Sequence, residues 1–396
     1  MTHRIYYHDP YQSSFEATVV ACEPDDRGFA VILDNTAFYP SSGGQPFDTG
    51  KLGEAAVFDV IDRDDGEIVH VVDRSVVVGA RVQGRIDWHR RFDHMQQHTG
   101  QHVLSAAFDR LFGVHTESFH LGTTSATIDL AREVSAQEIS TVEIEANRVV
   151  WEDRAVTIRF ASEDDARTLR LRKESVRSGL VRLIEVADFD LSACGGTHVG
   201  RTGAIGIILL ASWERFRGGS RLEFLCGGRA RARFNEWRDA LAATRQLLSV
   251  APADLAAAVE KLQFESKSLQ KHLRTQLEAL AAHEARALVS RAQRVGDRRI
   301  VVDALEGWDA AGLKLLAAAA ANEAPDTAIA LFSRSAPPVA VIAAGAASGI
   351  DASAAMKALT ASFGGKGGGK REMAQGGGFG APVEELLAAA RAHLVK

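Results

Sequence analysis

Residues 231–295 contain no glycine and a single proline, Pro252, which makes this stretch the strongest constraint on the fold. Beyond the proline, apolar residues follow one another in alternating steps of three and four. They are Leu255, Val259, Leu262, Leu269, Leu273 and Leu280, with Ser266 and Gln276 at the two interruptions. Such spacing places the residues on one helix face. We expect a long helix or a helical hairpin, with a seam that suits a coiled-coil contact with another chain.

The remaining sequence divides into regions of different character, as expected for a chain of 396 residues. Residues 1–86 consist of short β-prone runs separated by turn signals, which predict a small barrel. Residues 87–230 mix helical and strand patterns, and residues 296–396 alternate between them. The expected strands are 15–22, 28–33, 54–63, 67–73, 156–160, 181–186, 205–210, 221–226, 300–304, 328–332 and 339–343, and the expected helices are 92–111, 137–151, 309–323, 351–362 and 382–394.

Composition narrows the class of protein. Apolar residues make up 46% of the chain and charged residues 24%, as in globular domains. No run of eighteen apolar residues occurs and the start has no apolar signal core, so we expect a cytoplasmic protein without a membrane segment. Three scattered cysteines exclude a disulfide framework. The net charge of −5 argues against generic nucleic-acid coating but leaves room for a local basic face.

Two histidines, His98 and His102, stand four residues apart in a segment expected to be helical. Such positions share one helix face, with Cβ atoms about 5–6 Å apart, so both imidazoles can reach one ion. His94 extends this face by a turn, and we interpret it, like His120, as structural. No glutamate follows His98, so the metalloprotease pattern H-E-x-x-H and its general base are absent.

A second motif, Cys194-Gly-Gly-Thr-His198, places a thiol and an imidazole four residues apart around two glycines. Glycines permit a tight turn that directs both side chains to one point. Together, His98, His102, Cys194 and His198 match the preference of zinc for nitrogen and sulfur ligands, and they predict one Zn²⁺ site. The alternative is a buried thiol and an unrelated loop histidine.

The role of such a zinc is open at this point. Catalytic sites usually keep three protein ligands and one exchangeable position, whereas four ligands describe a closed structural site. Either one histidine is displaced and zinc takes part in the reaction, or zinc only positions the substrate while another group activates water.

Four ordered motifs resemble the editing region of alanyl-tRNA synthetases. Phe38-Tyr-Pro-Ser-Ser-Gly-Gly-Gln45, followed by Asp48-Thr-Gly50, is similar to its glycine-rich segment, and the two zinc motifs follow in the same order. Gly219-Ser-Arg-Leu-Glu223, with Gly227 beyond, resembles the segment that closes the domain. The last hundred residues resemble the DHH-associated domain that ends these synthetases. Departures are confined to Gly100, Gln101 and Ser41, where the family often has other residues.

The resemblance implies an α+β multidomain fold: a glycine-rich β-barrel domain (1–86), an α+β zinc-binding editing domain (87–230), a helical or coiled-coil linker (231–295) and a DHH-associated α/β domain (296–396). The chain looks like the long form of the free-standing alanyl-tRNA editing proteins. These hydrolyse serine, and in some members glycine, from tRNA(Ala). Because the chain begins at the editing-like barrel, we expect no aminoacylation activity.

Candidate substrate contacts also come from the resemblance. Gln45 is the candidate for contacting the substrate near the metal, and Ser41 for reading the serine hydroxyl; the alternative for Ser41 is turn chemistry beside Gly43. Arg221 is a candidate contact for the acceptor end of tRNA, or an ordinary surface charge. A pocket that hydrogen-bonds a hydroxyl rejects a substrate lacking it by roughly 10⁴–10⁵, whereas a hydrophobic pocket rejects an added hydroxyl by only about 10².

The glycine run from Gly364 to Lys370 formally fits the P-loop pattern G-x-x-x-x-G-K, but we reject a nucleotide-binding loop. Arg371 stands where the magnesium-binding Ser or Thr belongs, and the run follows an expected helix instead of a strand. The glycine amides, with Lys366, Lys370 and Arg371, can instead contact RNA phosphates. The alternative is a flexible loop.

Three functions therefore compete. A trans-editing hydrolase is favoured; the others are a non-catalytic tRNA-binding protein with a structural zinc and a different zinc hydrolase such as a peptidase. The missing glutamate after His98 weighs against a peptidase. Expected partners are tRNA(Ala) misacylated with serine or glycine, and a second copy of the chain through the helical segment or the C-terminal domain.

Overall fold

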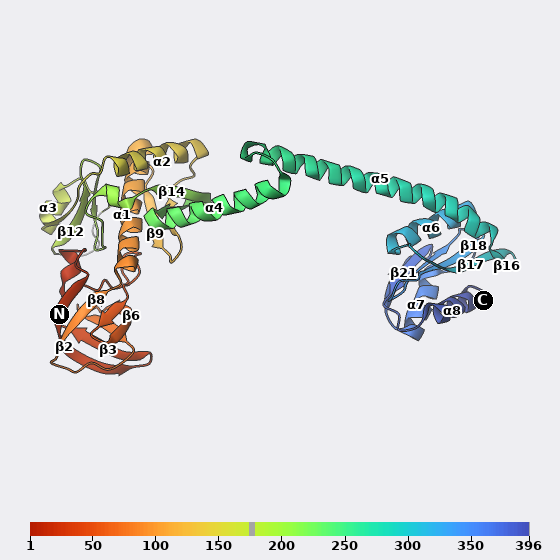
Figure 1. Cartoon of the computed structure of the whole chain (residues 1–396), viewed down its shortest axis with the longest axis horizontal. Helices are drawn as coiled ribbons and strands as arrows, with labels where there is room; N and C mark the ends of the chain where they lie inside the picture. Colours follow the sequence, from red (N-terminus) through yellow and green to blue (C-terminus); the bar gives the residue numbers. More distant parts are fainter. Residues whose placement is uncertain (174–178, 396) are drawn as a thin grey trace. The chain divides into compact units, whose positions relative to one another are not determined.

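The computed structural model describes residues 1–173 and 179–395. It divides into two compact units, Met1–Thr244 and Arg245–Lys396 (Figure 1). The first unit combines a barrel with an α+β part, and the second holds a six-stranded sheet with helices. This confirms the expected α+β class, while the four domain boundaries drawn from the sequence stay a prediction.

A closed six-stranded barrel lies near the start of the first unit. Its strands, in order of pairing, are β2 (Ser14–Asp25), β3 (Gly28–Leu33), β7 (Ile68–Val72), β6 (Ala55–Asp62), β5 (Gly50–Leu52) and β8 (Arg81–Ile86). Every pairing is antiparallel, and alternate apolar side chains such as Val31 and Val60 fill the interior. The short strands β1 (His3–Arg4) and β4 (Asn35–Thr36) pair outside it. Closure removes exposed strand edges.

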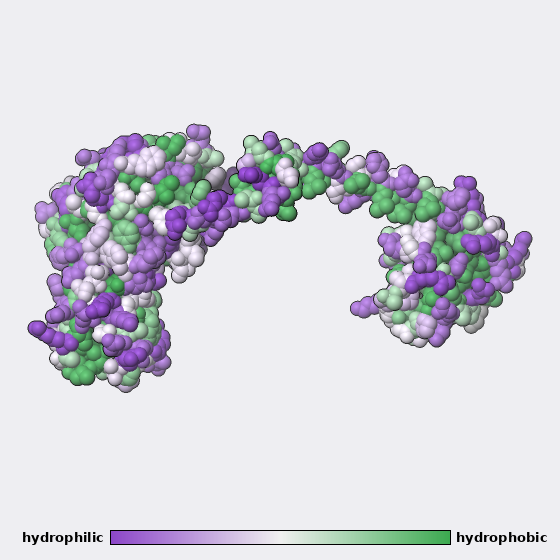
Figure 2. Space-filling view, viewed as in Figure 1, coloured by the Kyte–Doolittle hydropathy of each residue, from purple (hydrophilic) through white to green (hydrophobic). Residues whose placement is uncertain are grey.

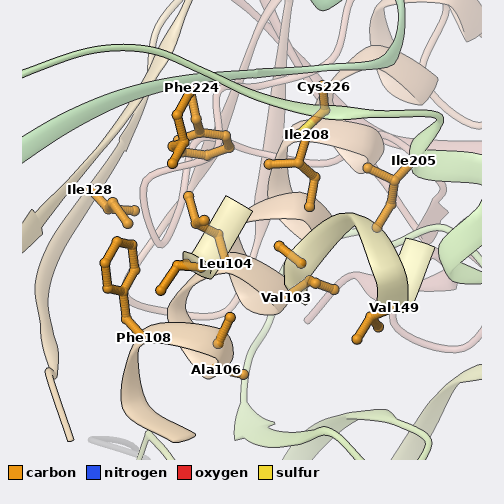
Figure 3. Close-up of a cluster of buried hydrophobic side chains, with 14 of the residues drawn as sticks. Val103, Leu104, Ala106, Phe108, Ile128, Val149, Ile205, Ile208, Phe224 and Cys226 are labelled. Atoms are coloured by element: carbon orange, nitrogen blue, oxygen red, sulfur yellow. The ribbon is translucent and has the colours of Figure 1, made fainter. Parts of the chain in front are cut away.

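Helix α1 (Trp88–Phe112) follows the barrel and organises the α+β part. It begins where the Asp87 side chain accepts a hydrogen bond from the Arg90 amide, and it ends at Gly113, whose φ of 63° is left-handed. Its apolar face packs against helix α2 (Ala136–Trp151) and against a four-stranded sheet (Figure 3). Burial on several sides explains why the polar side chains of α1 also lie inside.

Two antiparallel sheets complete the first unit. One has the order β14 (Ile208–Phe216), β15 (Gly219–Cys226), β10 (Ala126–Leu130) and β9 (Thr116–Leu121). The other has the order β11 (Val156–Ala161), β12 (Val181–Val186) and β13 (Asp190–Ala193), with the short helix α3 (Glu163–Thr168) after β11. The strand expected at 205–210 begins only at Ile208, because a 3-10 turn, η2 (Thr202–Ile205), precedes it and Asn147 binds the Ile208 backbone.

A buried ion pair ties α1 to the segment before it. Arg91 and Asp48 are both fully buried and form a bidentate contact. The guanidinium also donates to the backbone oxygens of Pro10 (2.8 Å) and Ala37 (2.5 Å), and Asp48 accepts from the Tyr39 amide (2.7 Å). With these bonds, both charges are compensated inside the protein.

Replacing Arg91 by methionine should lower the free energy of unfolding by about 3–5 kcal/mol, because Asp48 is left as an unpaired buried charge. Urea unfolding at neutral pH measures the change. Arg90→Met, one position away and only partly buried, is the matched control and should cost less than about 1 kcal/mol. An equal loss of unfolding free energy in the two variants would mean that the buried ion pair contributes no more to stability than the partly buried Arg90.

The second unit is a six-stranded sheet with helices on both faces. Its order is β16 (Gln293–Val295), β17 (Arg298–Leu305), β18 (Thr327–Ser333), β19 (Val339–Ala344), β21 (Met373–Gly377) and β20 (Lys366–Gly369). Alternate residues of β18 and β19 face opposite sides. One side packs against α6 (Ala310–Glu323) and the end of α5 (Leu255–Ser290), and the other against α7 (Ala352–Phe363) and α8 (Val383–Val395).

One expectation needs a small correction and one alternative is wrong. The stretch 231–295 is helical as expected and forms two helices, α4 (Gly227–Leu248) and α5, but its last residues form strand β16. The glycine run is a β-hairpin and not a loop: β20 pairs with β21, with Lys370 and Arg371 at the turn. A Cβ on Gly376 would lie 2.6 Å from Met356 Sδ, so the glycines are explained by the close packing of α7 on this hairpin.

In the parts of the chain that the structure covers, no helix combines the length and apolar character that a membrane crossing requires.

Candidate metal centre

The two histidine and cysteine motifs converge on one point, although they lie almost a hundred residues apart. One donor atom from each of His98, His102, Cys194 and His198 lies within 4.8 Å of all the others. Cys194 Sγ is 3.5 Å from His98 Nε2 and 3.3 Å from His198 Nε2. Zinc bonds of about 2.0–2.1 Å to nitrogen and 2.3 Å to sulfur give a tetrahedron with edges of about 3.3–3.6 Å. The donor set and its spacing therefore fit zinc.

A close approach of loop to helix makes this convergence possible. His98 and His102 lie on α1, and the other two residues lie in the loop after β13. At Gly196 this loop passes directly over His98: a Cβ there would lie 2.2 Å from His98 Cε1 and 2.4 Å from Nδ1. Gly196 is required because any side chain would occupy the space of the imidazole.

Asp190 orients His102 from the start of β13. Its Oδ2 lies 2.9 Å from His102 Nδ1, and since a carboxylate only accepts, Nδ1–H donates and the Nε2 lone pair is left for the centre. Arg172 and Ser192 donate to the same carboxylate. Burial alone would raise the pKa of Asp190, but its bonds to His102 and Arg172 outweigh burial and hold the pKa below its usual range.

The other two imidazoles are oriented in the same way. Gln45 is buried, and its Oε1 accepts from His98 Nδ1 (2.9 Å) and from the Thr197 amide (3.1 Å), while its Nε2 donates to Thr197 Oγ1 (2.8 Å). The Thr99 hydroxyl donates to a carbonyl one turn earlier in α1, so His198 Nδ1 is the donor in their 3.2 Å contact. All three histidines thus present Nε2 to the centre.

The charges in the cluster suit a cation. Burial would raise the pKa of Cys194, yet the imidazoles of His98 and His198 and the bond from His102 hold it well below the usual range, which favours the thiolate. Burial lowers the pKa of His198 to about 3. For His102 burial also acts downward, but its bonds to Asp190 and Cys194 prevail and raise the pKa. A thiolate is the form in which cysteine binds a divalent cation, so the lowered pKa of Cys194 favours metal binding.

Arg182 holds the cysteine loop from β12. The side chain is buried, and its Nη1 donates to the backbone oxygens of Cys194 (2.7 Å) and Gly196 (2.9 Å), while its Nε donates to Tyr7 O (2.9 Å). These bonds fix the turn that directs Cys194 toward the histidines. Sequence reasoning missed Arg182, because nothing local to β12 indicates what its side chain reaches.

None of the remaining candidates is among the four donors that the described residues bring together. Ser41 is exposed, and its Oγ accepts from the Phe47 amide (3.2 Å), which is turn chemistry. Arg221 forms a bidentate pair with Asp129 (2.6 and 2.8 Å) and covers the Phe216 ring. Lys366, Lys370 and Arg371 are exposed on the hairpin of the second unit.

Of the two histidines interpreted as structural, neither belongs to the group of four donors. His94 is buried, and its Nδ1 has no partner among the described residues. Burial, and to a lesser extent the positive charges of neighbouring arginines, lowers the pKa of His94 to about 3. His120 is exposed on β9.

Asp190→Asn should weaken zinc binding about 10–100-fold, because the support of a metal-binding histidine is lost. Competition with a chromogenic chelator measures the affinity. Asp165→Asn, which changes an exposed carboxylate in α3, is the control and should leave the zinc affinity unchanged.

Because folding lowers the pKa of Asp190, its carboxylate stabilises the metal-free fold above an unfolded pKa of about 3.9, and this contribution fades as the pH falls further. The difference in stability between wild type and Asp190→Asn should therefore shrink in acid.

Three family matches cover separate parts of the chain. Residues 11–90 match the class II (A) tRNA synthetases, residues 181–222 the second additional domain of threonyl and alanyl tRNA synthetases, and residues 297–396 the DHHA1 domain. They contain, in turn, all six strands of the barrel, the Cys194–His198 motif and five of the six strands of the second unit's sheet, all but β16.

Relatives that align over 71–78% of the chain agree with these matches. The mouse alanyl-tRNA editing protein Aarsd1 is 33% identical over 300 residues, covering 71% of this chain and 73% of that protein. The alanyl-tRNA editing protein AlaX-L of Pyrococcus horikoshii is 30% identical over 319 residues, covering 78% of each. An alanine–tRNA ligase of Pyrococcus furiosus is 36% identical over 323 residues, which are 77% of this chain but only 35% of the ligase. The chain thus spans about a third of that ligase.

The fold, the four-donor cluster and the family matches together define the class of protein: the chain is related to alanyl-tRNA synthetases. The chain belongs to the family of alanyl-tRNA editing proteins. This confirms the resemblance drawn from the sequence motifs.

Proposed function

We propose that the chain is a zinc-dependent trans-editing deacylase that hydrolyses the aminoacyl ester of mischarged tRNA(Ala), most readily Ser-tRNA(Ala) and also Gly-tRNA(Ala). The observation that carries the proposal is the meeting of four donor atoms within 4.8 Å in a chain of this family. His98, His102, Cys194 and His198 would hold the zinc. When bound, zinc supplies a Lewis acid or a template for the ester carbonyl.

The chain's own residues prepare the site in the absence of substrate. Gln45, Asp190 and Thr99 each fix one imidazole, so that no ligand has to reorient when the ester arrives. Cys194 is partly exposed, while the three histidines are buried. Because the three side-chain hydrogen bonds of Gln45 go to His98 and Thr197 within the site, we assign it a positioning role.

Recognition of the serine hydroxyl is assigned to Ser41. Its oxygen accepts from the Phe47 amide, and its own O–H can still donate to a substrate hydroxyl. A site that hydrogen-bonds the hydroxyl leaves polar groups unpaired when alanine enters, which disfavours the correctly charged tRNA.

The partner in this proposal is tRNA. Lys366, Lys370 and Arg371 present three exposed cations on the β20–β21 hairpin, where glycine backbone lets phosphates approach closely. Arg221 would contact the acceptor end, although Asp129 already neutralises much of its charge. A second copy of the chain is the other partner, through α5 or the C-terminal unit.

A comparison of Ser-tRNA(Ala), Gly-tRNA(Ala) and Ala-tRNA(Ala) as substrates tests the function. We expect loss of serine at least about 100-fold faster than loss of alanine, with glycine in between. Equal rates on all three would contradict the specificity.

A non-catalytic tRNA-binding protein is the second candidate, since four protein donors also describe a closed structural zinc site. Tight binding of tRNA(Ala) with every ester left intact would favour it.

A further inference from the structure

Helix α1 carries two further polar side chains in line with the metal centre. Arg90, His94 and His98 are spaced by four residues, so they share one face of the helix. The glycine-rich segment crosses this face. Gln45 accepts from His98 at one end, and the Phe47 backbone oxygen accepts from Arg90 Nε (3.0 Å) at the other. His94 lies between these two contacts and is buried.

His94 has a polar atom that the chain leaves without a partner. The side chain is only 2% exposed, and Nδ1 makes no hydrogen bond to any described residue. Burial and the charges of Arg90, Arg229 and Arg91 lower the pKa to about 3, so the imidazole is neutral at physiological pH. Buried polar atoms are normally hydrogen-bonded, so we expect a group from outside the chain to complete this one.

The charges around this imidazole leave one cation without a counter-charge. Arg91 pairs with Asp48, and Arg229 pairs with Asp93 at 2.7 Å. Arg90 has no carboxylate within 4.0 Å in the parts of the chain that the structure describes. Two of the three guanidinium groups are therefore neutralised, and the positive charge of Arg90 is available to a ligand.

Arg90 is also held in place. Its Nε is bound to the Phe47 backbone, and its Cζ lies 5.3 Å from the centre of the Phe47 ring. Its two Nη atoms make no hydrogen bond to any described residue. Hydrophilic groups are spread over the visible face of the first unit (Figure 2), so an exposed arginine alone would indicate no site. A fixed guanidinium with free donors, next to a buried imidazole that lacks a partner, indicates a bound anion.

The distance from the metal centre indicates which anion this is. Arg90 lies eight residues before His98, which is about 12 Å along α1. In the proposed function, the substrate holds its ester at zinc and continues from there into a chain of nucleotides joined by phosphates. A guanidinium binds such a phosphate through two parallel N–H bonds.

We propose that Arg90 and His94 form an anion site beside the metal centre, and that it holds a phosphodiester group near the 3′ end of the tRNA. Arg90 binds the phosphate directly, and a water molecule links the phosphate to the buried Nδ1 of His94. The inference rests on the proposed function, because the substrate is the same. It assigns two residues that bind the nucleic acid and take no part in the hydrolysis of the ester.

Arg90→Met should raise KM for Ser-tRNA(Ala) at least about 10-fold and leave kcat unchanged, because a charge-assisted contact with the substrate is lost. The dependence of log KM on log salt should become shallower by about 0.7, the share of one phosphate on a single strand. Arg90→Lys, which keeps the charge, should restore part of the affinity. Arg81→Met is the matched control, since Arg81 is an exposed arginine of the barrel, and it should behave like the wild type.

Seryl-adenosine tests whether the contact is with phosphate. It carries the same ester but no phosphate, so Arg90→Met and the wild type should hydrolyse it with the same KM. An equal rise in KM on both esters, or no rise on Ser-tRNA(Ala), would overturn the inference and leave the proposed function standing. A wild type that hydrolyses neither ester would contradict the proposed function. The affinity for uncharged tRNA(Ala), weakened by Arg90→Met and not by Arg81→Met, then tests the anion site without catalysis.

His94→Leu tests the second residue of the site. If Arg90 and His94 hold one group, their effects are coupled, and the double variant with Arg90→Met should raise KM by less than the product of the two single effects. Independent effects would remove His94 from the site. His94→Asn, which keeps a polar atom near the Nδ1 position, should recover the affinity that His94→Leu loses. Elemental analysis checks that both variants keep their zinc.

Inorganic phosphate distinguishes a nucleic acid from a free ion. If a phosphate ion were the natural occupant, it would inhibit hydrolysis of seryl-adenosine by the wild type and not by Arg90→Met. That result would overturn the assignment to tRNA. We expect no such difference at constant ionic strength, because a free ion lacks the second attachment that the ester gives to tRNA.

Discussion

Cys194→Ala should lose its zinc and, with it, at least about 100-fold of kcat/KM for Ser-tRNA(Ala). Losing the support of a metal ligand already costs about 10–100-fold, and loss of the ligand itself exceeds that. Cys194 is the only sulfur donor of the four and the residue that both neighbouring imidazoles meet, at 3.5 and 3.3 Å. Elemental analysis of the purified variant and single-turnover deacylation measure the two effects.

Cys22→Ala is the control, because Cys22 is a partly buried barrel thiol with its own contact to the Val76 amide. It should keep one zinc per chain and full activity. A Cys194→Ala variant that deacylates at the wild-type rate would remove the metal from the reaction, and zinc retained without activity would show that the thiol acts beyond ligation.

The sequence was sufficient for the cluster itself, because helical periodicity joins His98 to His102 and the tight glycine turn joins Cys194 to His198. The residues that support these four ligands were not predicted in that role. Gln45 was singled out by resemblance, but as a substrate contact and not as the bond between the two motifs. Arg182 acts through tertiary contacts that leave no local pattern. For Asp190 a signal existed, since metal-binding histidines commonly donate to a carboxylate.

Helices and strands with strong sequence periodicity could be predicted. Elements whose formation depends on tertiary packing were missed. Strands β9 and β10 went unrecognised, although Ala126, Ile128 and Leu130 alternate with polar residues and are buried in that pattern. The hairpin of β20 and β21 could not be foreseen, since a glycine-rich run has weak strand propensity on its own. It forms because β19 and α7 supply the partners.

Gly196→Ala should have the second large effect on zinc binding and deacylation, because the turn of the cysteine motif leaves no space for a side chain at this position. The added methyl would lie 2.2 Å from His98 Cε1 and 3.1 Å from Gln45 Oε1, so that either the imidazole or the loop must move. A ligand displaced by about 1 Å no longer completes the tetrahedron, and remote misplacements of that size cost about 10²-fold in rate. We expect a loss of at least about 100-fold in deacylation and a matching loss of zinc.

The adjacent glycine offers a matched control within the same turn. A Cβ on Gly195 meets nothing nearer than Tyr7 Oη at 3.7 Å, an ordinary contact, so Gly195→Ala should bind zinc and deacylate Ser-tRNA(Ala) like the wild type. Neither glycine has a positive φ, so backbone strain is the same for both substitutions and only the space around the methyl differs. Equal activity in the two variants would show that the loop is free to withdraw from His98. The four donors would then not be held together before the metal binds.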